Sequence, residues 1–325
     1  MESPKTSRSP LIDAHSHIGA DLMFYLNGWY PYALDWATLS RMAHDGGIGR
    51  VAVFPMVTNV AMNIAGLKSG QIETNGALES VPYAFENRRM MEEISRMPHP
   101  MVEPLPVWII DPVRSCREQA EALRKLKSEH PCSSLKIQGT ILQSKVTGLL
   151  GDGGVFLDLA EEWNVPIIIH SSIKPEDIWS QCSDILTVAK SRPSVRFTLA
   201  HSCRFDVPSL DEVASLSNTW FDCSAHGIHC QLAVLDLSNI AVPERRFRSD
   251  YRNPTQVLHD LAVAYPGKLC WGTDAPFDSY VDSSISLISS YEAEAAMLNG
   301  LSDEIRQEIA CTNSEAFFGI KAGAK

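Results

Sequence analysis

The sequence predicts a protein of the α/β class, a closed (β/α)8 barrel in which eight parallel strands alternate with helices. Short apolar runs alternate with longer amphipathic stretches nearly from end to end, and we count eight such runs. Strands that alternate with helices imply right-handed βαβ units and a parallel sheet. Eight units are the number that closes a barrel.

The elements follow in order along the chain. The predicted strands cover residues 10–18, 51–56, 102–110, 134–138, 165–170, 195–201, 220–224 and 268–274. The predicted helices cover residues 35–45, 84–97, 115–129, 155–162, 175–190, 209–216 and 255–264. Pro175 with the two acids after it predicts a helix start, as do the pair Asn253-Pro254 and, in the tail, Ser302.

Three segments exceed ordinary loop length: residues 57–82, 139–151 and 225–253. The first and the last follow strands two and seven, so they are extended loops on the face where the strands end. We expect them to shape the substrate pocket. The basic run at residues 244–248 is interpreted as a solvated surface stretch rather than an anion site or a subunit contact.

Composition limits the protein class. The chain has 325 residues, 45% hydrophobic and 21% charged, with a net charge of −11, which fits a folded protein. We expect one domain over residues 1–325 with a barrel core at about 10–320. The acidic balance argues against nucleic acid and anionic membranes as partners. The chain shows no apolar run of ~18 residues and no visible signal peptide, so we expect a cytoplasmic protein. None of its eight cysteines forms a CxxC pair, so we expect reduced thiols. As partners we expect a small-molecule substrate and, in a homodimer, a second copy of the chain.

His15 and His17 are the first candidate ligands. Because side chains alternate along a strand, these two imidazoles share a face and can reach one metal ion. The same alternation predicts that Ile12, Ala14 and Ile18 point outward, toward covering helices.

Three more polar residues each close a separate apolar run. His170 and His201 end the runs at 165–170 and 195–201, and Asp274 ends the run at 268–274. A barrel builds its active site at the carboxyl ends of its strands. Imidazole and carboxylate without thiolate suit Zn²⁺, with Mn²⁺, Fe²⁺ or Co²⁺ as alternatives. One such ion with an open position would lower the pKa of bound water to about 7.

Four motifs, in chain order, resemble the amidohydrolase superfamily: "LIDAHSHIG", "VPIIIHSS", "FTLAHSC" and "CWGTDAPF". They look closest to the amidohydrolase-related branch of TIM-barrel metal-dependent hydrolases, which also contains non-oxidative decarboxylases. The segments "SSLKIQG" and "TNSEAFFGI" are similar to that branch as well, so the resemblance spans residues 10–320. Residues 140–154 lack the family's His-Pro pair and Ser172 replaces a frequent glycine, which leaves the substrate open.

Carried over by motif, the resemblance implies that His15, His17, His170 and Asp274 ligate one divalent metal. It implies that His201 activates the metal-bound water or polarises the substrate, and that Asp274 also shuttles the proton.

Lys136 has two interpretations. In binuclear relatives a lysine at this place is carbamylated and bridges two metals, whereas here an unmodified lysine, paired with a carboxylate or contacting substrate, is preferred. Arg204 is a candidate anchor for a substrate carboxylate through its two-pronged guanidinium, and Trp29 a candidate pocket wall. The alternative for Arg204 is an ordinary exposed surface position, and the alternative for Trp29 is packing in the core. His226 and His229 are interpreted as non-ligands in the 225–253 loop.

Three functions are compatible with these residues. The preferred one is metal-dependent hydrolysis, in which activated water attacks a C–O or C–N carbonyl of a small organic substrate. The alternative is non-oxidative decarboxylation of a small, aromatic carboxylic acid, which favours a cationic anchor and an aromatic pocket. The third is a metal-binding scaffold without turnover, which the presence of His201 beside a full ligand set makes less favourable.

Overall fold

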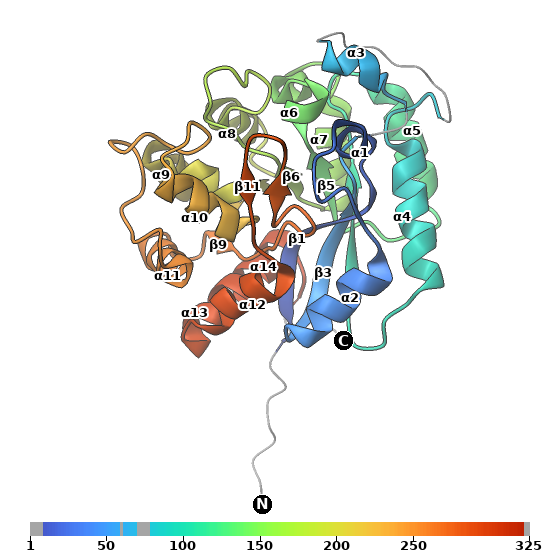
Figure 1. Cartoon of the computed structure of the whole chain (residues 1–325). Helices are drawn as coiled ribbons and strands as arrows, with labels where there is room; N and C mark the ends of the chain where they lie inside the picture. The colour runs from blue at the N-terminus through green and yellow to red at the C-terminus, as the bar shows by residue number, and fades with distance from the viewer. Residues whose placement is uncertain (1–8, 59–60, 70–78, 322–325) are drawn as a thin grey trace, which may run out of the picture.

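The computed structural model describes residues 9–58, 61–69 and 79–321 (Figure 1). Residues 1–8 lie outside the described residues, as do 59–60 and 70–78 of the predicted 57–82 loop. In the described ranges no helix is long and apolar enough to cross a membrane. All eight cysteines fall inside these ranges and are buried, unpaired thiols.

A curled nine-stranded sheet forms the centre of the fold, in the order β2-β1-β3-β4-β5-β6-β7-β8-β9. Its two ends meet, because Ala14 N donates to Trp271 O at 2.9 Å and Asp274 N donates to His15 O at 2.7 Å. All eight predicted runs contain a parallel strand, and the barrel prediction is confirmed. These strands are β1 (Leu11–Ala20), β3 (Ile48–Pro55), β4 (Glu103–Ile109), β5 (Ser134–Ile137), β6 (Ile167–Ile169), β7 (Phe197–Leu199), β8 (Thr219–Asp222) and β9 (Leu269–Cys270). The short β2 (Ala33–Leu34) pairs antiparallel with β1.

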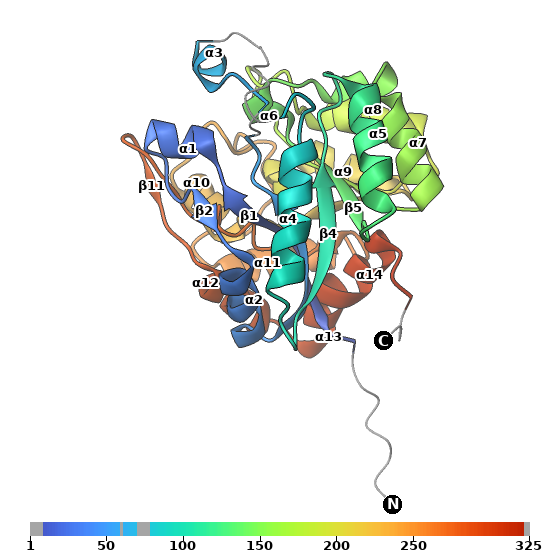
Figure 2. The ribbon, with the colours of Figure 1, turned by 90° about the vertical axis from the view of Figure 1, so that its right-hand side faces the viewer.

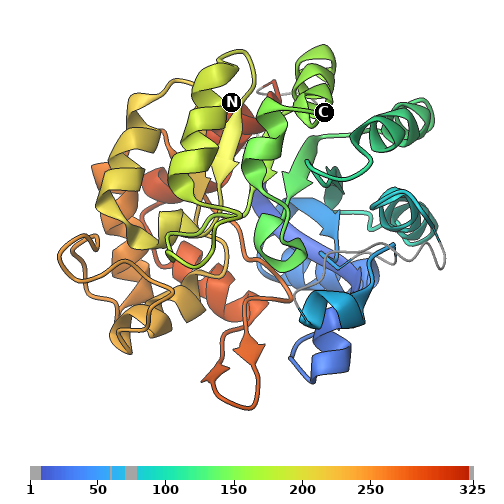
Figure 3. The ribbon, with the colours of Figure 1, turned by 90° about the horizontal axis from the view of Figure 1, so that it is seen from above.

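Helices surround the strands, as the view from above shows (Figure 3), and α4 and α5 lie on the outside of β4 (Figure 2). Most helices match their predicted ranges within a few residues. They are α2 (Trp36–Asp45), α4 (Ala84–Arg96), α5 (Cys116–Lys127), α7 (Gly154–Trp163), α9 (Val207–Ser215) and α11 (Pro254–Ala264). The predicted caps also form: Asn253 Oδ1 accepts from Gln256 N at the start of α11, and Ser302 Oγ accepts from Ile305 N in α13 (Asp303–Gln307).

The helix predicted over residues 175–190 is wrong in its first half. Helix α8 begins only at Cys182 (Cys182–Ser191). Asp177 does not occupy a first helical turn; its Oδ1 accepts from Trp179 N at 3.1 Å and Ser180 N at 3.3 Å. The carboxylate therefore stabilises a tight turn in place of a helix start.

Side chains alternate between the barrel interior and the helix-covered exterior. Phe54 and Ile168 belong to the interior cluster. Trp108 faces outward and packs edge-on against Trp163 of α7, with ring centroids 6.1 Å apart. Phe317 of α14 (Asn313–Phe318) joins the interior cluster from the amino-terminal end of the barrel. The closed base leaves the opposite end, where the strands finish, as the place for a site.

The predicted loop at residues 225–253 contains helix α10 (His226–Val234). Arg245 and Arg248 of its basic run are exposed, as predicted, but the side chain of Arg246 is only 11% exposed, so the interpretation as a solvated stretch is wrong for Arg246. Arg245 and Arg246 nevertheless form a clamp. Arg245 forms a two-pronged ion pair with buried Asp206, with both N–O distances 2.8 Å. Arg246 donates to the carbonyls of Ala233 and Ala241 at 3.0 and 2.7 Å. These contacts fasten the insertion to the start of α9.

Candidate metal centre and active site

A bulge in β1 sets the direction of the site residues. Between Asp13 and Ser16 three steps along β1 oppose two steps along β3, which moves the following side chains to the other face. Ile12 and Ala14 consequently pack in the barrel interior, so the predicted outward orientation is wrong for them. Ile18, beyond the bulge, lies in the exterior cluster as predicted.

His15, within the bulge, and His17, beyond it, point into the barrel and converge on Asp274. The Nε2 atoms of His15 and His17 lie 3.2 and 3.4 Å from Asp274 Oδ1. Each ring also uses its Nδ1: His15 Nδ1 lies 3.0 Å from Asp222 Oδ2, and His17 Nδ1 lies 3.0 Å from Pro55 O. A ring that donates from Nδ1 presents a lone pair at Nε2, which is the orientation that metal-binding histidines adopt.

Asp13 fastens the two segments that carry these ligands. Its carboxylate accepts from Ser16 Oγ at 2.7 Å and from His15 N at 3.1 Å, both in β1. It also accepts from Thr273 N at 3.0 Å and Thr273 Oγ1 at 2.8 Å, immediately before Asp274. This fully buried acid therefore holds the closing seam of the barrel in register.

The three residues fit a divalent cation. His15, His17 and Asp274 offer ligand atoms that all lie within 4.8 Å of one another, and all three are buried. Burial alone would lower the pKa of His15, but the flanking carboxylates of Asp222 and Asp274 outweigh it and raise that pKa. The position therefore favours positive charge, and its nitrogen and oxygen donors are those that zinc and its neighbours accept.

Lys136 lies at the centre of the barrel, 1% exposed. Its Nζ lies 3.1 Å from His15 Nε2 and 5.1 Å from the centre of the Phe54 ring. Burial lowers the pKa of Lys136 to about 8, although Asp222 and Asp274 act in the opposite direction. Among the described residues no carboxylate is within ion-pair distance of it, so its partner is a site histidine rather than the acid that the unmodified-lysine interpretation allowed.

His170 and His201 follow β6 and β7 and face each other beside the three-residue cluster. His201 Nε2 lies 2.9 Å from His170 Nδ1, and His201 Nδ1 lies 3.1 Å from Ser224 O and 3.9 Å from Asp274 Oδ2. Burial, with the charge of Arg204, holds the pKa of both rings well below the usual value. Both are therefore neutral imidazoles adjacent to, but outside, the cluster of His15, His17 and Asp274.

Arg204 reaches the same site from an unusual backbone. The segment His201–Phe205 is a left-handed turn, in which five successive non-glycine residues have φ between 48° and 64°. Each such residue costs roughly 1–2 kcal/mol. Arg204 Nε donates to Ser171 O at 3.0 Å, and one of its terminal nitrogens donates to His170 Nε2 at 3.2 Å. Its other terminal nitrogen contacts Nε2 of His229.

His229 lies on α10 and lines the site, with its ring 5.0 Å from that of His201. It contacts Arg204 and is absent from the candidate ligand group. His226 lies one turn earlier, and its Nε2 donates to Pro254 O at 2.9 Å.

One cavity of about 360 Å³ lies at the carboxyl ends of the strands, and it is lined by the ligand cluster and by Lys136, His170, His201, Arg204 and His229. Its walls are aromatic and apolar: Phe24 of α1 (Leu22–Asn27), Trp29, Phe277 and Tyr280. The Phe24 ring lies 5.3 Å from the ring of Trp29 and 4.9 Å from that of Phe277. Trp29, a tentative pocket residue from the sequence, thus lines the cavity. This volume is at the small end of the range for ligand pockets.

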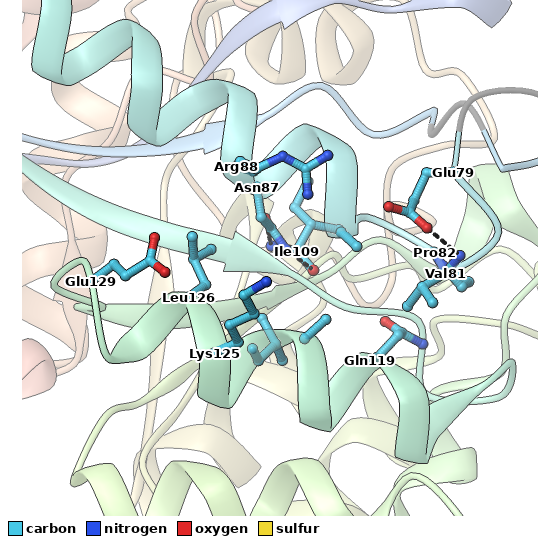
Figure 4. Close-up of a pocket in the computed structure, with 13 residues that line it drawn as sticks. Glu79, Val81, Pro82, Asn87, Arg88, Ile109, Gln119, Lys125, Leu126 and Glu129 are labelled. Carbon is cyan, nitrogen blue, oxygen red and sulfur yellow. Dashed lines mark hydrogen bonds between the residues drawn. The ribbon is translucent and has the colours of Figure 1, made fainter.

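A second cavity, of about 320 Å³, lies between α4 and α5 on the outside of the barrel (Figure 4). Asn87 bridges its floor, since its side chain bonds both the N–H and the carbonyl of Ile109 at 3.0 and 2.9 Å. The cavity shares no lining residue with the ligand cluster.

Sequence reasoning missed Asp13, Asp222 and His229. Asp222 could have been found, because it stands near the end of a predicted strand, as Asp274 does. It accepts from the backbone nitrogens of His201 and Ser224 at 3.2 and 3.0 Å in addition to its contact with His15. His229 was interpreted as a non-ligand, which agrees with its absence from the ligand cluster, but its contact with Arg204 was not predicted.

Comparison with solved structures supports the fold. An amidohydrolase from Burkholderia multivorans with bound HEPES has a TM-score of 0.60 at 13% identity, covering 96% of this chain and 100% of that chain. A 2,6-dihydroxybenzoate decarboxylase complexed with 2,6-dihydroxybenzoate has a TM-score of 0.58 at 12% identity, covering 95% and 98%. Dihydroorotase from Campylobacter jejuni has a TM-score of 0.57 at 14% identity, covering 99% and 87%. At such identities these likenesses establish the barrel fold.

A comparison with curated proteins found no match. The model of one protein family, described as amidohydrolase, matches residues 12–320, a range that contains every site residue described above. The chain therefore belongs to the amidohydrolase family.

Proposed function

We propose that this chain is a metal-dependent hydrolase that directs water onto a C–O or C–N carbonyl of a small organic substrate. The observation that carries the proposal is the convergence of His15, His17 and Asp274 at the mouth of the barrel, within 4.8 Å of one another. His170 follows β6, the strand next to the one that carries Lys136, and is the fourth proposed ligand. To bind the ion, its ring has to exchange the contact of Nε2 with Arg204 or of Nδ1 with His201 for the metal. A divalent ion in this position, zinc in the first instance, would polarise the substrate carbonyl and acidify water.

Asp274 is the proposed proton acceptor and donor. Burial acts to raise its pKa, but the positive charge of His15 and the close contacts with the rings of His15 and His17 outweigh burial and keep the pKa well below the usual value. The carboxylate is therefore ionised at neutral pH and can accept the proton of the attacking water. It can then return that proton to the leaving oxygen or nitrogen.

His201 is the proposed electrophilic partner. Its neutral ring is held by Ser224 O at 3.1 Å and Ser224 Oγ at 3.0 Å, both at Nδ1, which fixes the ring orientation beside Asp274. A neutral imidazole fixed in this way can hold or pass a proton at the reacting carbonyl. The cavity of about 360 Å³ restricts the reaction to a small substrate.

The test is a substrate screen on the full chain loaded with zinc or manganese. Lactones, esters and amides are followed by acid release in a pH-stat. We expect metal-dependent hydrolysis, and we expect His201→Asn to lower kcat by roughly 100- to 10,000-fold with its metal retained. Hydrolysis that is unaffected by chelation and by His201→Asn would contradict the proposal.

Decarboxylation of a small aromatic acid is the second candidate. The ring pairs of Phe24 with Trp29 and with Phe277 support it, because they form a wall suited to a planar substrate. The same screen includes aromatic acids with CO₂ detection. Release of CO₂ without any hydrolysis would favour this candidate over the first.

A further inference from the structure

Arg204 is a cation that forms no close ion pair within the part of the chain that the structure describes. Among the described residues no carboxylate lies within ion-pair distance of it, and its three protein partners are a carbonyl, Ser171 O, and the two neutral rings of His170 and His229. An arginine always carries its charge and only donates hydrogen bonds, so the facing Nε2 atoms of both rings must be acceptors. These contacts orient the guanidinium without adding negative charge to it, and the carboxylates of Asp274, Asp177 and Asp222 act on it only from beyond ion-pair distance.

Two of its donors are also unused. A guanidinium has five N–H groups, and the three contacts above use one each. Arg204 lines both the 360 Å³ cavity and an adjoining polar cavity of about 350 Å³. The remaining two N–H groups have no partner among these contacts, and the side chain borders space that a ligand can enter. Two parallel N–H groups are the match for a carboxylate.

The chain maintains this arrangement at a cost. Five left-handed residues bring His201 and Arg204 into one wall of the cavity. The turn is held from the insertion, because Ala241 N donates to Arg204 O at 3.0 Å and Phe247 N donates to Phe205 O at 2.9 Å. Backbone strain of this kind persists where the surrounding structure fixes it, and it concentrates at ligand-binding sites.

We infer that Arg204, supported by His170 and His229, is a carboxylate-binding subsite, and that the substrate is a small carboxylic acid with a planar or apolar body. The body would lie against the wall of Phe24, Trp29 and Phe277. This inference deepens the proposed function by naming the substrate class. It applies whether the reacting group is an ester, a lactone or an amide elsewhere in the molecule, or the carboxylate itself.

The experiment is calorimetric binding of benzoate and of benzamide, its neutral isostere, to the zinc-loaded full chain. Wild-type protein should bind benzoate at least about tenfold more tightly than benzamide. Arg204→Gln should weaken benzoate binding by about 10- to 100-fold, and Arg204→Lys should fall between. Arg248→Gln is the control, because Arg248 is exposed and its loss changes the net charge equally; it should leave benzoate binding within about twofold.

Equal binding of benzoate and benzamide, no benzoate binding by wild type, or equal effects of Arg204→Gln and Arg248→Gln would overturn the inference. If Arg204→Gln does not fold, the inference is tested by the ratio of benzoate to benzamide affinity in wild type and by the benzoate affinity of Arg204→Lys. Arg204-dependent benzoate binding by a protein without hydrolytic activity would leave the subsite standing and refute the proposed hydrolysis. Hydrolysis of neutral esters without Arg204-dependent benzoate binding would support the proposed hydrolysis and refute the carboxylate subsite.

Discussion

Among the residues outside the ligand cluster, Asp222 should have the largest effect on metal affinity. Its Oδ2 lies 3.0 Å from His15 Nδ1, and its Oδ1 accepts from His201 N and Ser224 N at 3.2 and 3.0 Å and from Ser224 Oγ. The substitution Asp222→Asn keeps the shape and replaces one acceptor oxygen by an NH₂ donor. Because donors lie on both sides of this side chain, His15 Nδ1 on one and His201 N and Ser224 N on the other, the new NH₂ group faces a donor whichever way it turns.

The free-energy cost follows from this conflict. If the NH₂ faces His15, the ring must accept at Nδ1 and carry its proton on Nε2, which removes the lone pair that points at Asp274. If the NH₂ faces the other side, the backbone donors of His201 and Ser224 lose their acceptor. Loss of such a supporting contact lowers metal affinity by about 10- to 100-fold, or about 1.4–2.7 kcal/mol.

The assay is zinc competition against a chromophoric chelator at neutral pH. Asp222→Asn should show the weakened zinc dissociation constant, while Asp152→Asn, at an exposed aspartate, should match wild type. Equal zinc affinity of Asp222→Asn and wild type would refute the reasoning that this carboxylate fixes the His15 ring.

Two further predictions concern stability. Arg245→Ala removes the two-pronged ion pair with Asp206, whose side chain is 2% exposed while that of Arg245 is 57% exposed. We expect this variant to lose about 1–2 kcal/mol in the free energy of unfolding by urea, whereas the control Arg248→Ala should match wild type. Equal stabilities of the two variants would contradict the role of the clamp. Glu294 of α12 (Tyr291–Asn299) is fully buried, and burial raises its pKa from 4.5 to about 7. A raised carboxyl pKa stabilises the fold fully below the unfolded pKa, and this contribution is lost as pH rises through 7. Wild-type stability should thus fall by up to about 3 kcal/mol from this group between pH 5 and 8, and Glu294→Gln should show a flatter profile; parallel profiles would contradict the assignment.

The strand order and the main ligands were predictable for one physical reason. The carboxyl ends of parallel strands meet at one end of a barrel whatever the details of their register. His15, His17 and Asp274 therefore come together even though the predicted outward orientation of Ile12 and Ala14 was wrong. The helices were predictable from their apolar periodicity, and the caps at Asn253 and Ser302 from their side-chain chemistry.

Other features depend on backbone geometry that residue patterns do not encode. The bulge between Asp13 and Ser16 breaks the alternation within one strand, and nothing in the residue types marks the offset. The left-handed turn at His201–Phe205 contains no glycine, so no sequence signal for positive φ exists there. His229 enters the site only because α10 folds back over the barrel mouth. Asp177 ends a turn rather than starting a helix because its carboxylate meets Trp179 N and Ser180 N.

The central claim is that the mouth of this barrel holds a divalent metal on His15, His17 and Asp274. Its most direct test is elemental analysis of the purified full chain after dialysis against zinc, for wild type, His17→Ala and Asp274→Ala. The account predicts about one zinc ion per wild-type chain and near-complete loss in both variants, with folding confirmed by circular dichroism. Full retention of zinc by both folded variants would contradict it.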